Sequence, residues 1–183
     1  MELICLGLTH RTAPVDVRER FAVSEPNLGE TCGRLRELDG VEEGVVISTC
    51  NRTEYYLAGG DPEAVLERLR GFLNEHVGAA LGDEHLYERK AEDVARHLCR
   101  VVSGMDSMVL GETEVFGQTK RAYKAALEAG HTSGGLNKLF QRAFAVGKKV
   151  RTVTGIQVGQ TSIGSVAVDL AEKIFGHLRD SRV

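Results

Sequence analysis

Tryptophan is absent from this chain of 183 residues, and aromatic residues of all kinds make up only 5% of it. The core is therefore expected to consist mainly of leucine, valine and alanine. A large excess of charge of one sign is also missing, because the formal net charge is only -3. The sequence thus lacks the global basic field that holds nucleic acid, although a local basic surface is compatible with this balance.

Long apolar runs and targeting signals are missing as well. No stretch approaches the roughly 20 apolar residues that a membrane-spanning helix requires. The segment Met1–Leu6 has an acid in second position and lacks the basic start and cleavage region of a signal peptide. We therefore expect a cytoplasmic protein that stays out of membranes, with one sizeable core or a core plus an appendage.

The cysteines do not form a metal-binding or redox pattern. There is no CxxC pair, and no paired histidine motif completes a zinc site, so no metal is expected. Cys5, Cys32 and Cys99 lie in apolar strand-like or helix-like segments and are expected to be small buried hydrophobes. Cys50 instead ends an apolar run and precedes Arg52 by two positions, and a nearby permanent positive charge favours a reactive thiolate.

Hydrophobic periodicity predicts strands in the first half of the chain and helices in the second. Strands are expected at 3–8, 45–49 and 53–57, with a short candidate at 85–87, and helices at 15–21, 24–38, 61–77, 91–102, 113–128, 136–150 and 162–175. Only a few residues separate the second and third strands, which predicts a hairpin with Cys50 at its connection. We therefore predict an α+β fold, with a small, mainly antiparallel sheet in a split βαβ arrangement followed by a helical segment.

A dinucleotide-binding fingerprint is not visible in the chain. No GxGxxG follows a predicted strand, and the segment 111–120 lacks the spacing of a phosphate loop because Gln118 stands where a lysine is required. The sequence therefore predicts no cofactor site here.

Several motifs together resemble glutamyl-tRNA reductase, the first enzyme of the five-carbon route to tetrapyrroles and porphyrins. In chain order they are GLTHRTAP at 7–14, VRE at 17–19, STCNRTE at 48–54, SGMDSMVLGE at 103–112 and GQ at 117–118. Motifs in register over nearly the whole chain are far more specific than any single short pattern. The resemblance implies an oxidoreductase whose cysteine attacks the ester of glutamyl-tRNA to form a thioester, which NADPH then reduces to glutamate 1-semialdehyde.

The resemblance also assigns site residues. Cys50 would be the nucleophile, and His97 matches a histidine important for activity. Contacts with the glutamyl group are implied for Thr49, Asn51, Arg52, Ser107, Glu112, Thr113, Glu114 and Gln118. The segment 112–114 departs from the family's common Glu-Pro-Gln, and its second acid changes the local charge.

Four of these assignments, those of Arg52, Ser107, Glu112 and His97, have a structural alternative. Arg52 is suited to a bidentate grip on the substrate carboxylate, or it is a solvated surface arginine. Ser107 and Gln118 offer neutral hydrogen bonds, although Ser107 also fits a helix cap. Glu112 either receives the substrate ammonium or stabilises a helix N-terminus. The apolar helix face around His97 fits a buried core histidine as well as a residue that positions the ester or transfers a proton.

Domain boundaries and partners are implied in the same way. Residues 1–155 would form the catalytic, glutamyl-tRNA-recognising domain, and 156–183 would begin a long spinal linker helix. The family's NADPH-binding and C-terminal dimerisation domains are expected to be absent from this chain. The implied partners are glutamyl-tRNA, a second subunit in a homodimer, and glutamate-1-semialdehyde aminomutase.

Two other functions stay open. A non-catalytic tRNA-binding module would place basic residues of two helices against phosphates. Those residues are Lys120, Arg121, Lys124, Lys138, Arg142, Lys148, Lys149 and Arg151. The other alternative is a structural or partner-binding protein whose thiols are unrelated to its function.

Overall fold

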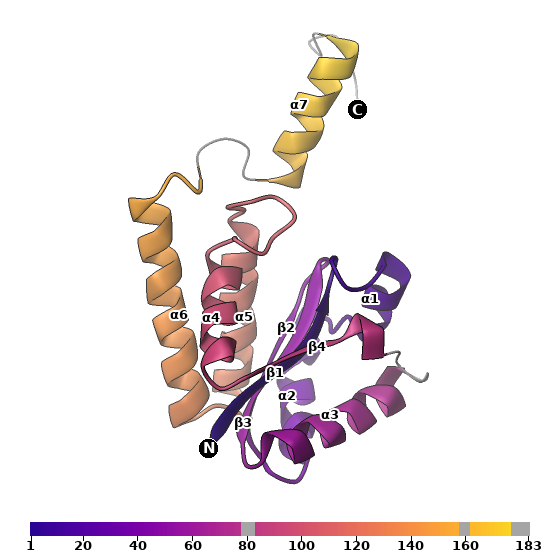
Figure 1. Cartoon of the computed structure of the whole chain (residues 1–183), viewed down its shortest axis with the longest axis vertical. Helices are drawn as coiled ribbons and strands as arrows, with labels where there is room; N and C mark the ends of the chain where they lie inside the picture. The colour runs from indigo at the N-terminus through magenta and orange to yellow at the C-terminus, as the bar shows by residue number, and fades with distance from the viewer. Residues whose placement is uncertain (78–82, 158–161, 177–183) are drawn as a thin grey trace.

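The protein forms a four-stranded antiparallel sheet between two groups of helices (Figure 1). The structure is a computed structural model that describes residues 1–77, 83–157 and 162–176. Its strands are β1 (Glu2–Thr9), β2 (Val41–Ser48), β3 (Arg52–Gly59) and β4 (Tyr87–Lys90). Its α-helices are α1 (Val15–Phe21), α2 (Leu28–Arg36), α3 (Pro62–Val77), α4 (Glu92–Val102), α5 (Glu114–Glu128), α6 (Gly134–Val153) and α7 (Ile163–Phe175). Two short 3-10 helices are η1 (Glu25–Asn27) and η2 (Asp83–His85).

The strand order is β2-β3-β1-β4, and each neighbouring pair is antiparallel. Since β1 and β2 both run antiparallel to β3, they are parallel to each other with β3 inserted between them. Likewise, β3 and β4 both run antiparallel to β1, which lies between them, so β3 and β4 are parallel to each other. The sheet is therefore a doubled split βαβ unit, which confirms the predicted α+β fold.

Strand β3 is buried along its whole length because helices cover both faces of the sheet. Alternate residues of a strand face opposite sides. Tyr56 packs edge-on against Phe140 of α6, with ring centroids 5.5 Å apart. Leu57 faces the other side, where Gly44 of β2 leaves room for Leu35 of α2. The helices α4, α5 and α6 thus cover one face, while α2 and α3 lie across the other (Figure 1).

Two strands differ from their predicted limits. Strand β2 begins at Val41 rather than at 45, because Gly44 lies inside the strand and not in a turn, and its N–H donates to the His131 carbonyl at 3.0 Å. Strand β4 covers Tyr87–Lys90 rather than 85–87. It is a half-exposed edge strand, so an apolar pattern could not locate it, and His85 belongs to η2 instead.

The helix predicted over 24–38 is also interrupted. Pro26 lies in η1, and the α-helical part, α2, starts only at Leu28. The segment between the last two predicted helices, 136–150 and 162–175, lies partly outside the described residues, as does the end of the chain after residue 176.

A buried carboxylate attaches α6 to the sheet. Glu43 of β2 is fully buried, and its oxygens accept hydrogen bonds from the backbone N–H groups of Ser133 (2.6 Å), Gly135 (2.8 Å) and Leu136 (2.9 Å). These donors would otherwise have no partner at the start of the helix. Burial raises the pKa of Glu43, but the three backbone hydrogen bonds outweigh it and leave the pKa below its usual value.

Helix α7 extends away from the rest of the molecule (Figure 1). It begins with a capping box, in which the Ser162 Oγ accepts from the Ser165 N–H at 3.1 Å. Its large apolar side chains Val168, Leu170, Ile174 and Phe175 are all more than half exposed. Among the described helices, including α7, none combines the length and apolar character needed to cross a membrane.

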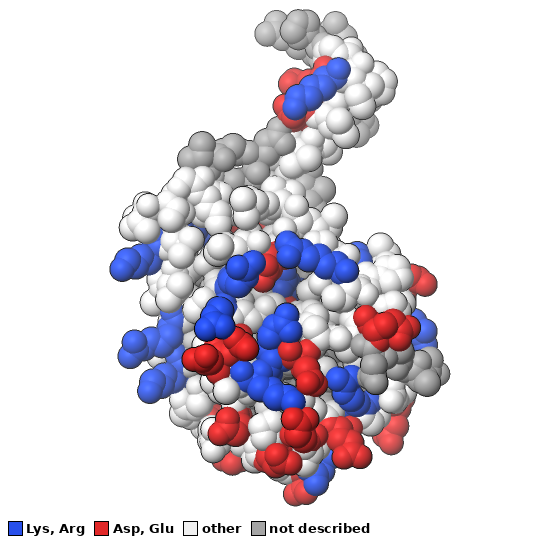
Figure 2. All heavy atoms as spheres, in the orientation of Figure 1, with Lys and Arg blue, Asp and Glu red and all other residues white. Residues whose placement is uncertain are grey.

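Charged side chains are distributed unevenly over the surface. Figure 2 shows lysine and arginine side chains along the edge where α6 lies in Figure 1, whereas basic and acidic side chains are mixed over the centre of the view.

Candidate active site

Cys50 lies in the turn between β2 and β3, and its side chain is exposed. Cys5 and Cys32 are buried, as predicted, and Cys99 is half-buried. The turn is held by Thr49, whose Oγ1 accepts from the N–H groups of both Asn51 and Arg52 at 3.2 Å. The Thr49 N–H also donates to the Arg52 carbonyl at 2.8 Å. The hydroxyl of Thr49 therefore shapes the backbone that presents the thiol.

Helix α1 and the loop before it support the same turn from outside. The Arg18 Nε donates to the Cys50 carbonyl at 3.2 Å, and the Arg18 Nη1 donates to the Ala13 carbonyl at 2.8 Å. The His10 N–H donates to the Asn51 carbonyl at 2.9 Å. The thiol thus projects from a backbone fixed on both sides, with the Arg18 guanidinium on the Cys50 carbonyl.

Arg52 points into the protein and is only 2% exposed, so the alternative of a solvated surface arginine is wrong. Its Nη1 donates to the Glu54 Oε1 at 2.7 Å, and its Nη2 donates to the Asp106 carbonyl at 2.7 Å. Residues two apart on a strand share a face, which brings Arg52 and Glu54 together. Within this structure the carboxylate that Arg52 grips is Glu54.

Glu54 is the centre of a buried hydrogen-bond network. Besides Arg52, it accepts hydrogen bonds from the hydroxyls of Tyr56 (2.7 Å) and Tyr87 (2.5 Å) and from the His97 Nε2 (3.0 Å). Burial raises the pKa of Glu54, but the Arg52 charge and the hydrogen bonds from His97 and Tyr87 hold that pKa well below its usual range. An ionised carboxylate only accepts hydrogen bonds, so the proton between Glu54 and His97 resides on Nε2.

His97 is nearly buried, and its second ring nitrogen faces another carboxylate. The His97 Nδ1 lies 3.8 Å from the Asp106 Oδ2, too far for a hydrogen bond. Arg100 holds Asp106 with two hydrogen bonds, at 2.8 and 3.2 Å. Burial raises the pKa of Asp106, but the hydrogen bonds and charge of Arg100 lower it overall. The Nδ1 of His97 is therefore the nitrogen left for proton transfer.

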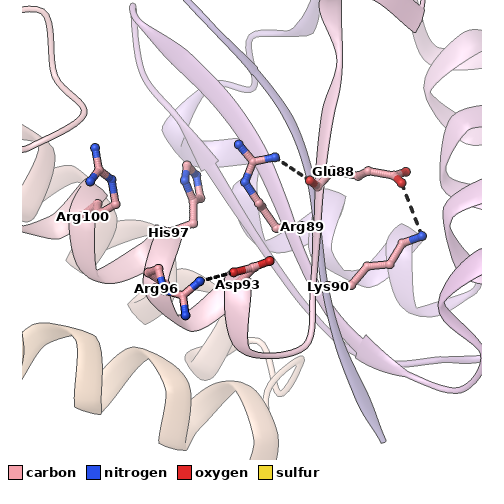
Figure 3. Close-up of a pocket in the computed structure, with 7 residues that line it drawn as sticks. All are labelled: Glu88, Arg89, Lys90, Asp93, Arg96, His97 and Arg100. Carbon is pink, nitrogen blue, oxygen red and sulfur yellow. Dashed lines mark hydrogen bonds and ion pairs between the residues drawn. The ribbon is translucent and has the colours of Figure 1, made fainter.

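Two adjoining hollows open beside this network and share Arg89, His97 and Arg100. In Figure 3 these three side chains extend from β4 and α4 on the same side. The hollow next to Arg52 measures about 280 Å³, and the one between β4 and α4 measures about 430 Å³. Their lining carries cations (Arg11, Arg52, Arg89, Lys90, Arg96 and Arg100) and fewer carboxylates (Glu88, Asp93 and Asp106). The site is therefore suited to an anionic group.

The loop 103–113 closes around two glycines. Gly104 and Gly111 have φ angles of +76° and +81°, and the Gly111 N–H donates to the Gly104 carbonyl at 2.9 Å. Ser107 in this loop is buried, and its hydroxyl has no hydrogen-bond partner among the described residues, so it is not a helix cap. Glu112 is also buried, and none of the cations the structure describes lies within ion-pair distance of its carboxylate.

Not all predicted contacts gather at the same place. Thr113 and Glu114 are exposed at the start of α5, and the Thr113 side chain does not cap the helix. Gln118 lines a separate hollow of about 100 Å³, together with Ser48. Arg52 and His97 line the hollow of about 280 Å³, while Cys50 lies on the hairpin between Ser48 and Arg52.

Sequence reasoning missed part of the network. Glu54 was inside the quoted motif, and its spacing from Arg52 and Tyr56 at alternate strand positions was the available signal. Asp106 was likewise inside a motif. For Tyr87 and Arg89, on the short edge strand, the chain carried no comparable signal.

The described residues do not fit a dinucleotide or a metal. Gly59 ends β3 and Gly60 follows it, but both serve a backbone contact. A Cβ at Gly59 would lie 2.0 Å from the Gly40 carbonyl oxygen, and the Gly60 N–H donates to that oxygen at 2.9 Å. No group of three or more His, Cys, Asp or Glu in the described ranges is arranged to hold a metal ion.

Comparisons with known proteins agree on one family. Residues 6–154 match the family model described as "Glutamyl-tRNAGlu reductase, N-terminal domain". The glutamyl-tRNA reductase of Akkermansia muciniphila is 54% identical over 184 residues, which cover 100% of this chain and 54% of that protein. Glutamyl-tRNA reductase 2 of Koribacter versatilis is 44% identical over 185 residues, covering 100% of this chain and 42% of that protein.

A solved structure gives the same result. The glutamyl-tRNA reductase from Methanopyrus kandleri matches with a TM-score of 0.73 and 33% identity, covering 93% of this chain and 39% of that one. The chain spans about half the length of the curated relatives it matches. On its sequence and its fold, the chain belongs to the glutamyl-tRNA reductase family and corresponds to the N-terminal domain of that family.

Proposed function

We propose that this chain performs the acyl-accepting step of a glutamyl-tRNA reductase, with Cys50 as the nucleophile. The observation that carries the proposal is the exposed Cys50 thiol on a fixed hairpin, two residues before Arg52, which lines a basic hollow together with His97. The thiolate sulfur forms a bond to the ester carbonyl carbon of glutamyl-tRNA. The carbon–oxygen bond to the terminal ribose breaks, and the product is a glutamyl thioester on Cys50.

The leaving oxygen needs a proton, and His97 is the proposed source. Its Nε2 proton is engaged by Glu54, so the proton that is transferred is one carried on Nδ1: the imidazolium gives it to the ribose oxygen and is left as neutral His97 with its proton on Nε2. The Glu54 contact also fixes the ring, and a fixed proton donor needs no reorganisation when the ester bond breaks.

Recognition of the glutamyl group is proposed to use opposite charges at two places. The side-chain carboxylate would lie in the hollow lined by Arg52 and Arg89, where Arg52 is already oriented by Glu54. The ammonium group would meet the Glu112 carboxylate, and the unpartnered Ser107 hydroxyl would donate or accept a hydrogen bond. Contacts from Asn51, Thr113, Glu114 and Gln118 stay predictions of the family resemblance.

The remaining steps belong to the whole enzyme. The family resemblance implies that NADPH supplies the hydride that reduces the thioester. The described residues do not fit a dinucleotide, so no step is derived through NADPH. Homodimerisation, the aminomutase partner, the tetrapyrrole pathway, the cytoplasmic location and the domain division at residue 155 stay predictions.

The test is to incubate the chain with glutamyl-tRNA and to search for a covalent glutamyl adduct by mass spectrometry of cysteine peptides. We expect the adduct on the peptide that contains Cys50. Cys50→Ser should abolish it, while the matched variant Cys99→Ser, at a half-buried thiol, should leave it unchanged. An equal amount of adduct in Cys50→Ser would rule out Cys50 as the nucleophile.

A further inference from the structure

Helix α6 has an unusual charge composition. Over Gly134–Val153 it carries five basic residues and no acidic one, in a chain whose net charge is -3. In the same orientation as Figure 1, Figure 2 shows basic side chains along this edge of the molecule. An excess of one sign on one element is the electrostatic footprint of a polyanion-binding surface.

Most of these cations are not used by the fold. Lys138, Arg142, Lys148 and Lys149 are exposed, and no carboxylate of the described residues lies within ion-pair distance of them. Two exposed cations of the neighbouring helix α5 are paired. Arg121 of α5 lies 3.2 Å from Glu25, and Lys124 lies 3.5 Å from Glu128. The positive charge of α6 is therefore left uncompensated by its neighbours.

Three of the four free cations form a single stripe. Since 3.6 residues make one helical turn, offsets of four and seven residues return to the same face, so Lys138, Arg142 and Lys149 are aligned. At a rise of about 1.5 Å per residue the stripe is about 16 Å long. Lys148 faces α5 instead, where it and Lys120 border a groove of about 300 Å³ that contains Phe116 and Phe144.

The fifth basic residue ties this helix to the candidate active site. The Arg151 Nη2 donates to the carbonyl of Val102 (3.0 Å), just before the loop 103–113, and to that of Glu112 (3.3 Å), near the end of the loop. The next segment touches the same loop, because a Cβ at Gly111 would lie 1.9 Å from the Ile156 carbonyl oxygen. One end of the stripe is therefore held against the loop that carries Ser107 and Glu112.

We propose that the exposed stripe Lys138–Arg142–Lys149 of α6 binds the phosphate backbone of the substrate's tRNA and directs the aminoacylated end toward the loop 103–113. This inference rests on the proposed function, because it takes the ligand to be an RNA that carries a glutamyl ester. An RNA backbone is favoured over an acidic protein because a continuous row of phosphates matches a row of cations without interspersed carboxylates.

The test measures binding of an uncharged tRNA transcript to the chain at several salt concentrations. In the variant Lys138→Gln/Arg142→Gln/Lys149→Gln we expect affinity at low salt to fall at least about tenfold. The slope of log K against log salt should decrease by about 2–3, since each phosphate contact contributes a little under one unit. The charge-preserving variant Lys138→Arg/Arg142→Lys/Lys149→Arg should bind within about twofold of the unchanged chain.

A matched control removes three exposed cations from other helices. Arg20→Gln/Arg36→Gln/Arg68→Gln changes the net charge equally on α1, α2 and α3, and we expect less than about a threefold effect. Equal loss in both triple variants, or equal binding by the stripe variant and the unchanged chain, would overturn the proposal. Displacement of tRNA by polyglutamate at the same charge concentration would also overturn it, in favour of an acidic protein partner. If the triple variant does not fold, Lys138→Gln and Lys149→Gln alone should each lower the slope by about one.

This experiment tests RNA binding by the α6 stripe separately from the proposed reaction of Cys50. Binding of uncharged tRNA does not require Cys50, so the stripe can be supported even where no adduct forms. If the proposed function also holds, the stripe variant should lose adduct formation from glutamyl-tRNA yet keep it from 3′-glutamyl adenosine, which has no phosphate backbone.

Discussion

At the scale of single residues, the candidate site depends on the buried carboxylate of Glu54. It compensates the Arg52 charge, accepts from two tyrosines and fixes His97. A buried ion pair contributes little net stability over an apolar pair, but removing one partner leaves the other charge unpaired. Glu54 is therefore important both for the fold and for the orientation of His97.

Glu54→Gln should lower the free energy of unfolding at neutral pH by about 3–5 kcal/mol, because Arg52 would stay buried without a counter-charge. Urea denaturation followed by circular dichroism measures this. The control Glu88→Gln removes a carboxylate whose ion pairs are solvent-exposed, and it should cost less than about 1 kcal/mol. Equal losses of unfolding free energy in the two variants would contradict the claim that Glu54 compensates the buried Arg52 charge.

His97→Asn should slow thioester formation from glutamyl-tRNA by about 10²-fold or more, because the leaving ribose oxygen would lack its proton donor. A glutamyl p-nitrophenyl ester separates this role from a structural one, since its leaving group departs without a proton. We expect the variant to react with that ester at nearly the unchanged rate. Equal slowing with both esters would mean that His97 acts only by holding the site together.

At the scale of elements, the sheet positions α6 through Glu43. Three backbone N–H groups at the helix start converge on this one carboxylate. The negative charge also meets the positive end of the helix dipole. The stripe proposed to bind RNA therefore depends on a residue of β2 for its orientation.

Glu43→Gln should lower the free energy of unfolding by about 2 kcal/mol near pH 7, since it removes an ionised acceptor from the helix start. The folded-state pKa of Glu43 is below its usual value, so its contribution is fully present above the unfolded pKa, about 4.3. That contribution is lost as the pH falls through the lower folded-state pKa. The difference between the two proteins should shrink in acid, and Glu42→Gln, at an exposed neighbour, should show no such pH-dependent difference.

At the scale of the whole molecule, sequence patterns predicted the architecture better than the site. Alternation and helical periodicity are local properties, so they located most elements and the split βαβ arrangement. The limits of edge strand β4 could not be predicted, because its residues Glu88, Arg89 and Lys90 are polar and only its pairing with β1 makes it a strand. The hollow beside His97 depends on that strand, and so its lining could not be derived from periodicity.

The site itself could be predicted where its residues are close in sequence. The exposed thiol followed from the hairpin, and the Arg52–Glu54 pair was accessible from strand alternation. The contacts that join Arg52 to the Asp106 carbonyl and Glu54 to His97 connect residues 54 and 43 positions apart in the chain. Such contacts depend on packing between elements, which no local pattern specifies.

The most direct test of Cys50 as acyl acceptor is the time course of tRNA release from glutamyl-tRNA. We predict a rapid burst of one tRNA per chain as the thioester forms, followed by slow release as water hydrolyses it. Cys50→Ser should eliminate the burst, while Cys99→Ser should preserve it. A full burst in Cys50→Ser, or release by the unchanged chain no faster than spontaneous hydrolysis, would contradict the account.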